Sequence, residues 1–493
     1  MDERTPVLVG VGTARADADA ADLMVLAARH AADDAGTPAL LAAVERISVP
    51  RGTWGYADPA RLVADAIGAP GARRVLVNLG IPQQTLINDA LRHIAAGQLD
   101  VALIVGAEAR ARATRAARAT SGAGATAAQE RDARNPGTRD TPTAGETDPH
   151  GSGPDEVQSP AGRIVADAEI EAGLVVPVEQ YAMIDSALRR AEGASIEDHR
   201  WQIAELWARF NLVARSNPDA AFPAAMEAED IFRLGRDNRP LAFPYGKWHA
   251  SQWTVDQGAA LLLCSAGAAD RLGVPRDRWL FPLVGIESSF ELPLVARLAM
   301  HRWPAMRVLG QAASERLARP VSECDHLEVY SCFPAAVRVQ HRELGLAPDR
   351  TPTITGGMTF AGGPFNSFVL EATAAMARRL RREGGTALVT TVSGLLTKPG
   401  LAVWASAPDG SPALVADLAR EAKAATPSCG VRTDYHGPAT IAACTVAYDG
   451  VRPLELIAIL ETPDGDRLIR RSRDPELVER ATSEELLGTS LTV

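Results

Sequence analysis

Two residues with reactive side chains, Tyr330 and Cys332, stand close together in the C-terminal half of the sequence. Tyr330 ends a stretch, 324–330, whose apolar residues predict a buried strand, and Cys332 follows two residues later. The carboxyl ends of strands are where α/β proteins place their functional side chains. A thiolate at Cys332 would be a nucleophile, whereas a thiol packed in the core would be inert. In the simplest interpretation Tyr330 is a core residue with a hydrogen-bonded hydroxyl.

Metal and redox chemistry receive no support from the other candidate ligands. The five cysteines include no CxxC pair, which argues against zinc fingers and against a disulfide framework. His301 and His341 have no partners at metal-ligand spacing. The glycine pairs 356–357 and 362–363 allow close approach of the backbone, but neither opens a dinucleotide or Walker pattern. We therefore expect no metal and no tightly bound cofactor.

Composition indicates a globular protein. The 493 residues are 46% hydrophobic and 23% charged, with a formal net charge of −10. This acidic balance gives no support for binding nucleic acid or an anionic membrane surface. No apolar run reaches the roughly 18 residues of a membrane span. The N-terminus also lacks a signal-peptide pattern, so we expect a cytoplasmic protein.

The elements that must hold the candidate site form an internal repeat. A strand, a helix and a second strand, at 6–12, 22–36 and 44–49, return at 282–287, 304–317 and 324–330. Each half continues with a helix and a buried strand, within 88–105 and 368–392, and ends in a last strand, at 259–264 and 401–405. Alternating strands and helices predict an α/β fold with parallel sheets covered on both faces. We expect a site between the halves.

The first half is interrupted before its last strand. Segment 110–163 contains no Leu, Ile, Met, Phe, Trp or Tyr, and Val157 is its only branched aliphatic residue. Such a segment buries too little apolar surface to offset the entropy of ordering, so we expect a flexible excursion. Its arginine-rich start suits an anion or, more simply, a solvated surface loop. Segment 164–244 instead contains an amphipathic helix over 195–216, with a capping-box pattern, and is expected to form a lid.

The C-terminal segment, 407–493, has a third pattern. Three short strands, at 440–447, 454–461 and 467–471, are separated by turn signals and followed by a helix at 475–487. This pattern predicts a small β domain, similar to the oligonucleotide/oligosaccharide-binding (OB) barrel. The domains are therefore predicted at 1–109 with 245–275, 110–163, 164–244, 276–406 and 407–493.

Three local strings, together with the duplicated halves, resemble the thiolase superfamily. Residues 328–333 (EVYSCF) resemble its NEAF or HDCF motif, 356–364 (GGMTFAGGP) its GG…GHP stretch, and 250–260 (ASQWTVDQGAA) its ASGxxDGAA segment. The resemblance covers about residues 5–406, and the added β domain makes the chain most similar to type 1 thiolase-like proteins. It implies a five-layered core of two βαβαβαββ halves and a CoA or acyl-CoA ligand.

The residues that carry catalysis in thiolases are replaced. By the family's spacing, the nucleophilic cysteine falls on Gly80, the activating histidine on Gly363 and the asparagine of NEAF on Tyr330. No cysteine lies near 392–394, where the resemblance places the second catalytic cysteine. Because covalent acyl transfer needs such a set to act together, we predict that conventional thiolase activity is absent.

The resemblance leaves three hypotheses for function. The first is a thiolase-like protein of acyl-CoA metabolism, with an acyltransferase fold and an altered active site. The second is a CoA-thioester carbon–carbon lyase, because the steroid side-chain retro-aldolases, cysteine-lacking members of the superfamily, use tyrosines as acid and base. Tyr330 would take that role here, with Cys332 and His249 as further catalytic candidates. The third is a non-catalytic acyl-CoA-binding module that forms a homodimer or docks a protein partner through its C-terminal domain.

The resemblance also implies residues that bind CoA. Ser251 matches a serine through which the family contacts CoA. Tyr245, Lys247 and His249 would lie near the pantetheine tunnel, where they would contact a phosphate or a substrate carbonyl. The alternative for these three residues is an ordinary loop packed by neighbouring tryptophans.

Overall fold

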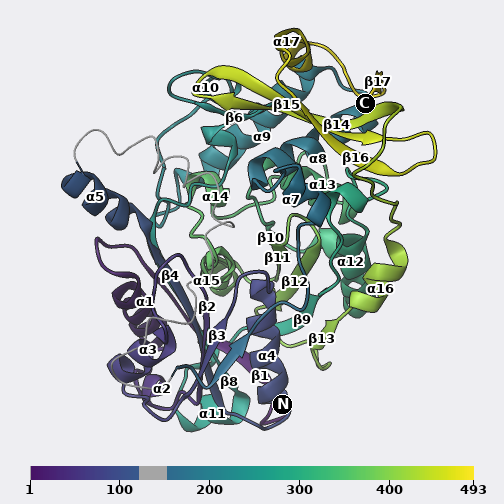
Figure 1. The fold of residues 1–493 in the computed structure, drawn as a ribbon. Coiled ribbons are helices and arrows are strands. Elements are labelled where there is room, and N and C mark those ends of the chain that lie inside the picture. Colours follow the sequence, from purple (N-terminus) through teal and green to yellow (C-terminus); the bar gives the residue numbers. More distant parts are fainter. Residues whose placement is uncertain (1, 122–152) are drawn as a thin grey trace.

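The computed structural model describes residues 2–121 and 153–493. Two sheets form its centre (Figure 1). The first has the order β1-β8-β4-β2-β3-β5, with bounds Pro6–Ala14, Asp256–Ser265, Val101–Ala109, Arg46–Pro50, Arg73–Val77 and Glu156–Gln158. The second has the order β13-β9-β12-β11-β10, with bounds Leu414–Asp417, Phe281–Glu287, Lys398–Ala405, Thr386–Ser393 and His326–Glu328. The order β1-β8-β4-β2 therefore repeats as β9-β12-β11-β10, which confirms the predicted duplication.

The sheets are mixed, and the expectation of parallel sheets was wrong in this respect. The last strand of each half, β8 or β12, is antiparallel to both of its neighbours. In the second half β11 and β12 are joined by the short turn 394–397, and a connection this short allows only antiparallel pairing. The remaining pairs of each repeat, such as β2 with β4 and β10 with β11, are parallel as expected.

Helices complete five layers. The helices α4 (Gln83–Ala95) and α15 (Phe368–Glu383) contact strands of both sheets and form the middle layer. On the outer face of the first sheet lie α1 (Ala20–Asp34) and α3 (Pro59–Ile67), with α2 (Ala39–Ala42) and α11 (Ala266–Arg271) nearby. On the second sheet lies α12 (Pro304–Leu317), beside α13 (Pro334–Glu343) and α16 (Ala419–Ala425).

Alternation along the strands explains this layering. In β4, Val101, Leu103 and Val105 pack into the outer core, whereas Ala102 and Ile104 pack into the central one. Both faces of the sheet are therefore buried. Glycine in β1 sets the distance to α1, because a Cβ at Gly12 would lie 2.0 Å from the carbonyl oxygen of Ala27.

The segment predicted as a flexible excursion contains two ordered elements among its described residues. The helix α5 (Arg110–Ser121) follows β4 directly, and Arg115 on it pairs with Asp17 and Asp256, each at 2.8 Å. At the other end, β5 joins the edge of the first sheet next to β3. Glu156 on β5 pairs with Arg46 at 3.2 Å and Arg73 at 3.0 Å. Ion pairs and backbone pairing thus order residues that bury little apolar surface; residues 122–152 lie outside the described part.

The predicted lid is helical. It contains α7 (Asp167–Glu171), α8 (Pro177–Glu192), α9 (Ile196–Ala214) and α10 (Ala228–Phe232). Ser195 caps α9 as the sequence predicted, since its Oγ accepts a hydrogen bond from the backbone N of Asp198 at 3.1 Å. The segment ends with the short strand β6 (Pro240–Ala242), and β7 (Tyr245–Gly246) follows directly after it.

The C-terminal segment is rich in strands, as predicted. It contains β14 (Pro438–Asp449), β15 (Arg452–Glu461), β16 (Arg467–Ser472), α17 (Pro475–Ser483) and β17 (Ser490–Thr492). The sheet order is β16-β15-β14-β6-β7, so strands of the lid extend the C-terminal sheet (Figure 1). The described strands form an open sheet, so the OB-type barrel is not confirmed. The domain boundaries stay predictions; β13, from this segment, pairs with β9 of the second central sheet. Among the described helices, none is long and apolar enough to cross a membrane.

Candidate functional site

Backbone hydrogen bonds bring the three motif strings together. The N–H of Ser251 donates to the carbonyl of Cys332 at 2.9 Å, and the N–H of Gln252 donates to the carbonyl of Met358 at 3.0 Å. The N–H of Gly363 in turn donates to the carbonyl of Gln252 at 3.0 Å. Three segments that are far apart in the sequence thus form one rigid junction at the carboxyl end of β10.

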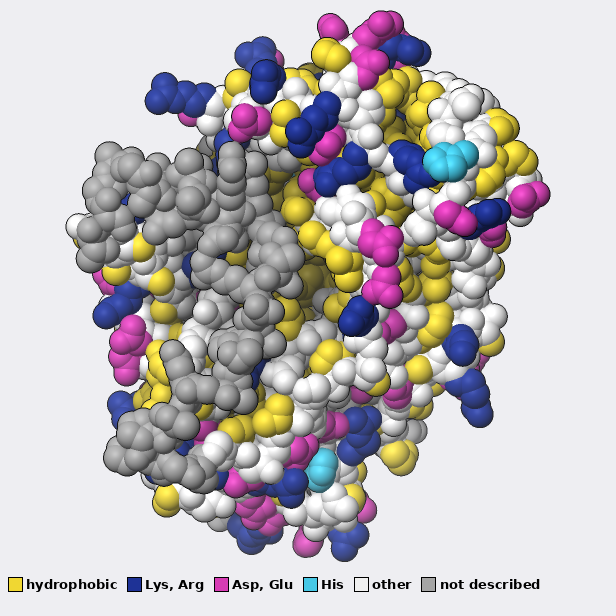
Figure 2. All heavy atoms as spheres, viewed as in Figure 1, with side chains coloured by type: hydrophobic (Ala, Val, Ile, Leu, Met, Phe, Trp, Pro, Cys, Tyr) yellow, Lys and Arg dark blue, Asp and Glu magenta, His cyan; other side chains and the backbone are white. Residues whose placement is uncertain are grey.

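A cavity of about 680 Å³ opens at this junction. Five of the sequence-predicted residues line it: Lys247, Ser251, Tyr330, Cys332 and Gly363. The lid adds residues 176–179 and Tyr181, and the C-terminal sheet adds Tyr448, Leu454, Glu455 and Arg471. Figure 2 shows hydrophobic side chains around a hollow in the middle of the molecule. The volume falls within the roughly 300–1,000 Å³ of small-molecule sites.

Tyr330 is held firmly in the wall of this cavity. Its N–H donates to Thr390 Oγ1 at 2.9 Å, and its carbonyl accepts from Gln340 Nε2 at 2.8 Å. Its ring lies edge-on against Phe368, with centroids 5.9 Å apart. Burial raises the pKa of the Tyr330 hydroxyl, with the neighbouring Cys332 adding to this and a hydrogen bond to Gln83 opposing it. The hydroxyl is therefore protonated at neutral pH.

Cys332 also lines the cavity, but its thiol is not activated. Burial raises the pKa of Cys332 to about 12, although a hydrogen bond to the Tyr181 hydroxyl lowers it in part. A thiol with this pKa is almost wholly protonated at pH 7, and the thiolate is the nucleophile. The environment of Cys332 matches the inert interpretation.

The position where the resemblance places the family's histidine, Gly363, is crowded. A Cβ at Gly363 would lie 1.9 Å from Ser251 Oγ and 3.2 Å from Met358 Cβ. Since real Cβ atoms do not approach so closely, Ser251 occupies the space that a side chain at 363 would need.

The position where the resemblance places the nucleophilic cysteine is crowded by residues that the sequence patterns did not mark. A Cβ at Gly80 would lie 3.1 Å from Pro160 Cγ and 3.6 Å from Ile164 Cδ1. Ile164 also packs near Gly394, where a Cβ would lie 2.7 Å from Thr397 Cγ2 and 3.2 Å from Ile164 Cγ1. In the stretch 392–394, where the resemblance places the second cysteine, Val392 lines the cavity. Gly80 is absent from the lining of the cavity.

The rim of the cavity carries cations. Lys247 begins a short 3-10 helix, 247–249, and its N–H donates to the carbonyl of Arg239 at 2.9 Å. Both side chains line the cavity. Partial burial, and then the charge of Arg239, lower the pKa of Lys247. Further along, Trp253 also lines the cavity and has the guanidinium of Arg110 over its ring at 3.4 Å.

Tyr245 and His249 lie behind this wall and do not line the cavity. The Tyr245 hydroxyl accepts a hydrogen bond from the N–H of Ala335 at 3.2 Å, at the start of α13. His249 Nδ1 accepts from the N–H of Gly246 at 3.0 Å, and burial, followed by the charge of Arg200, lowers the pKa of His249 to about 4. Both side chains are thus bound to the backbone of neighbouring elements.

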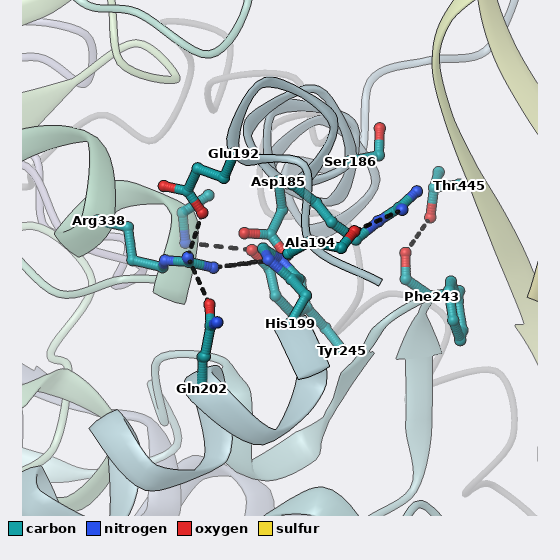
Figure 3. A network of polar contacts seen from close by, with 12 residues as sticks. Asp185, Ser186, Glu192, Ala194, His199, Gln202, Phe243, Tyr245, Arg338 and Thr445 are labelled. Atoms are coloured by element: carbon teal, nitrogen blue, oxygen red, sulfur yellow. Dashed lines mark hydrogen bonds and ion pairs between the residues drawn. The ribbon is translucent and has the colours of Figure 1, made fainter. Parts of the chain in front are cut away.

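A buried polar network lies next to Tyr245 (Figure 3). Asp185 on α8 contacts His199 Nε2 on α9 at 2.8 Å, and Arg338 Nη1 on α13 lies 2.8 Å from His199 Nδ1. Arg338 also pairs with Glu192 at 2.5 Å. Both nitrogens of His199 are therefore engaged, and the network joins the lid to the second half of the core.

The sequence analysis missed the polar residues that face the cavity from the lid and the C-terminal sheet. Glu179 on α8 lies 3.7 Å from Arg471 on β16, and Arg471 also contacts Glu455 at 3.2 Å. Burial raises the pKa of Glu179 to about 7, although the charge of Arg471 opposes the rise. No local pattern marks these residues, because they meet only when the lid folds over the C-terminal sheet. No group of three or more potential metal ligands occurs in the described part of the chain.

Comparison of folds identifies similar solved structures. A monomeric SCP2-thiolase-like protein type 1 from Mycobacterium smegmatis is 27% identical and superposes with a TM-score of 0.81, over 100% of this chain and 97% of that protein. Human mitochondrial 3-ketoacyl-CoA thiolase in complex with CoA is 17% identical, with a TM-score of 0.55 over 82% of this chain and 99% of that protein. The Ltp2-ChsH2(DUF35) aldolase is 16% identical, with a TM-score of 0.54 over 82% of this chain and 98% of that one. The sequence matches no protein-family model and no curated protein.

Proposed function

We propose that this chain, a member of the thiolase superfamily related to the SCP2-thiolase-like proteins, binds a CoA thioester but does not perform thiolase chemistry through a cysteine. One observation carries the proposal. The cavity where the three motif strings meet runs from a cationic rim, at Lys247 and Arg239, to a wall that holds Tyr330.

This arrangement matches the parts of CoA. Its phosphates need cations in solvent contact, which Lys247 and Arg239 supply. Its pantetheine arm needs a narrow, partly apolar passage with a few polar groups, which the stretch from Ser251 to Trp253 supplies. The thioester would then lie near Tyr330.

The surroundings of the former catalytic positions support the loss of covalent chemistry. A Cβ at Gly363 would overlap Ser251 Oγ, and a Cβ at Gly80, whose φ is +97°, would lie 3.1 Å from Pro160 Cγ, so both positions are crowded. Cys332 keeps its proton at neutral pH. No candidate in the cavity combines a nucleophile with an activating base.

A carbon–carbon lyase is the second candidate, and the position of the Tyr330 hydroxyl favours it. This hydroxyl is protonated and hydrogen-bonds Gln83 at the first turn of α4, where a helix N-terminus favours developing negative charge. In retro-aldol cleavage of a β-hydroxyacyl-CoA, the β-hydroxyl of the substrate loses its proton and the Cα–Cβ bond breaks. The electron pair passes into the thioester enolate, which then takes a proton at Cα. Tyr330 would donate that proton, and Glu179 is a candidate to accept the first one.

Calorimetric titration tests the binding proposal. CoA, acetyl-CoA and octanoyl-CoA should bind with micromolar dissociation constants, about −8 kcal/mol. Lys247→Ala should weaken binding about tenfold, because it removes a phosphate contact from the rim. Lys423→Ala, which changes an exposed lysine outside the cavity, should leave it within about twofold. Absence of binding to all three ligands would overturn the proposal.

Product analysis tests the lyase. Incubation with a β-hydroxyacyl-CoA should release a carbonyl product and a shortened acyl-CoA, and Tyr330→Phe should abolish the release while binding stays within about threefold. Tight binding without turnover would favour the non-catalytic module. In that case a second copy of the chain, or a protein docked on the C-terminal sheet, becomes the next partner to test.

A further inference from the structure

A second cavity, of about 310 Å³, lies between the N-terminus of α12, the C-terminus of α16 and the loop after β9. The helices α12 and α16 lie side by side (Figure 1). Three arginines line this cavity, Arg297, Arg302 and Arg307, and its lining includes no acidic side chain. Its charge is therefore of one sign.

The three arginines differ in how much of their charge is already balanced. Arg302 donates from Nε and Nη2 to Glu343, at 2.5 and 3.1 Å. Arg297 is 6% exposed and donates to the carbonyls of Leu292 and Leu395, at 3.1 and 2.7 Å. Its Nη1 has no hydrogen-bond partner among the described residues.

Arg307 is exposed, and no ion pair to its guanidinium occurs in the described part of the chain. It lies in the second turn of α12, a helix of 14 residues whose start, at Pro304 and Ala305, also lines the cavity. The N-terminal end of a helix favours negative charge. The helix end, the charge of Arg307 and the buried charge of Arg297 thus all favour binding of an anion in this cavity.

The rest of the lining is mostly apolar. Its walls include Phe290, Trp303 and Leu396. The small side chains of Ala299 and Ala425 also line the cavity and leave room between these walls. The hydroxyl of Thr397 is engaged, because it accepts from the N–H of Leu292 at 2.6 Å. A ligand for this cavity therefore needs a short apolar body as well as an anionic head.

We propose that this cavity binds a small organic anion, whose carboxylate or phosphate head contacts Arg307 and Arg297 and whose apolar body packs against Trp303 and Leu396. The site is distinct from the proposed CoA cavity. Leu395 lines the CoA cavity and Leu396 lines this one, and Arg297 holds the carbonyl of Leu395. The ligand is of a size that about 310 Å³ admits, near the lower limit of small-molecule sites.

The experiment uses the full chain and four probes: octanoate, phenyl phosphate, inorganic phosphate and octanol. Calorimetry should show that octanoate or phenyl phosphate binds at least tenfold more tightly than inorganic phosphate and octanol, because only the first two combine a head with a body. The tighter of the two shows which combination of head and body the cavity prefers. Equal binding of octanol and octanoate, or binding of neither amphipathic anion, would overturn the proposal.

Variants locate the binding. Arg307→Ala should weaken it at least fivefold, and Arg420→Ala, which changes an exposed arginine on α16 outside the lining, should change it by less than twofold. Ala299→Trp should fill the cavity and remove binding, and its melting temperature shows whether it folds. Anion binding that survives Arg307→Ala and a folded Ala299→Trp lies elsewhere and refutes the site. CoA titration of the same variants should be unchanged, so failure here and failure of the CoA proposal are distinguishable.

Discussion

The two halves of the core share the order of four strands, yet they differ where their strands end. In the first half, the residues after β3 lead to Gly80, which Pro160 and Ile164 cover. In the second half, the residues after β10 lead to Tyr330 and Cys332, which line an open cavity. The same framework is therefore closed in one half and open in the other.

This difference concerns the ends of the strands and not the strands themselves. Strand order depends on backbone pairing and on burial of both faces, and these are retained in both halves. The ends of the strands lie outside this framework. In the first half Ile164 packs against the residues after β3, and in the second half the residues after β10 face the cavity under the lid and the C-terminal sheet. The cavity therefore lies at the strand ends of the second half, under the lid and the C-terminal sheet.

A side chain placed at position 363 should have the largest effect on the free energy of unfolding. Gly363→Ala should destabilise the protein by about 3 kcal/mol, because its Cβ would overlap Ser251 Oγ. Ser251→Ala removes that oxygen, so the double variant should recover part of the loss, measured by urea unfolding of all four proteins. Gly363→His should be at least as unstable and should gain no thiolase activity. Purely additive losses would show that Ser251 does not fill the position.

The edge of the closed half offers the second test. Glu156→Lys should remove the partner of Arg46, which is 5% exposed, and should place like charges together, at a cost of about 2 kcal/mol. The strand β5 would then leave β3, and a bare sheet edge pairs with another chain. Light scattering after gel filtration should show concentration-dependent dimers. Val157→Lys, on an exposed residue of the same strand, is the control and should keep the wild-type mass.

The lid over the open cavity should contribute a pH dependence to stability through Glu179. Burial raises the pKa of Glu179 from 4.5 to about 7, so the folded protein keeps a proton that the unfolded chain releases between these pH values. Wild-type stability should therefore fall, relative to Glu179→Gln, as the pH rises from 4.5 to 7.5. The expected change in the difference is about 1–2 kcal/mol, because partial solvation reduces the full value of the shift. Denaturant titrations at four pH values measure it, with Glu197→Gln, an exposed glutamate on α9, as a flat control.

Much of the framework was accessible from the sequence. Helix α12 has the predicted bounds, and the Ser195 cap and the duplicated succession of strands and helices follow from local patterns and periodicity. The motif strings that contain Ser251, Tyr330 and Gly363 were identified through the resemblance. His249 appeared similar in sequence to Lys247 but lies behind the wall, because a turn of three residues points successive side chains in different directions.

What the sequence did not reveal depends on long-range packing. Ile164 follows a segment with almost no large apolar residue, and nothing local marks it as the residue between Gly80 and Gly394. The ordered strand β5 also escaped, because ion pairs with Arg46 and Arg73 hold it rather than apolar burial. Such contacts join residues about 80 to 230 positions apart, and no window along the sequence contains them.

Within the open half, substitution of Cys332 should have the smallest effect on binding and turnover. This test distinguishes a nucleophilic cysteine from one that only packs in the wall of the cavity. With a pKa of about 12, a fraction of roughly 10⁻⁴ of the thiol is ionised at pH 8. Iodoacetamide should therefore label Cys429, the cysteine that is not fully buried, well before Cys332, as peptide mass spectrometry would report. Cys332→Ala should change acyl-CoA binding by less than about twofold and should leave any lyase turnover intact. Rapid labelling of Cys332, or loss of turnover in Cys332→Ala with binding retained, would instead identify it as a nucleophile and return covalent chemistry to this half.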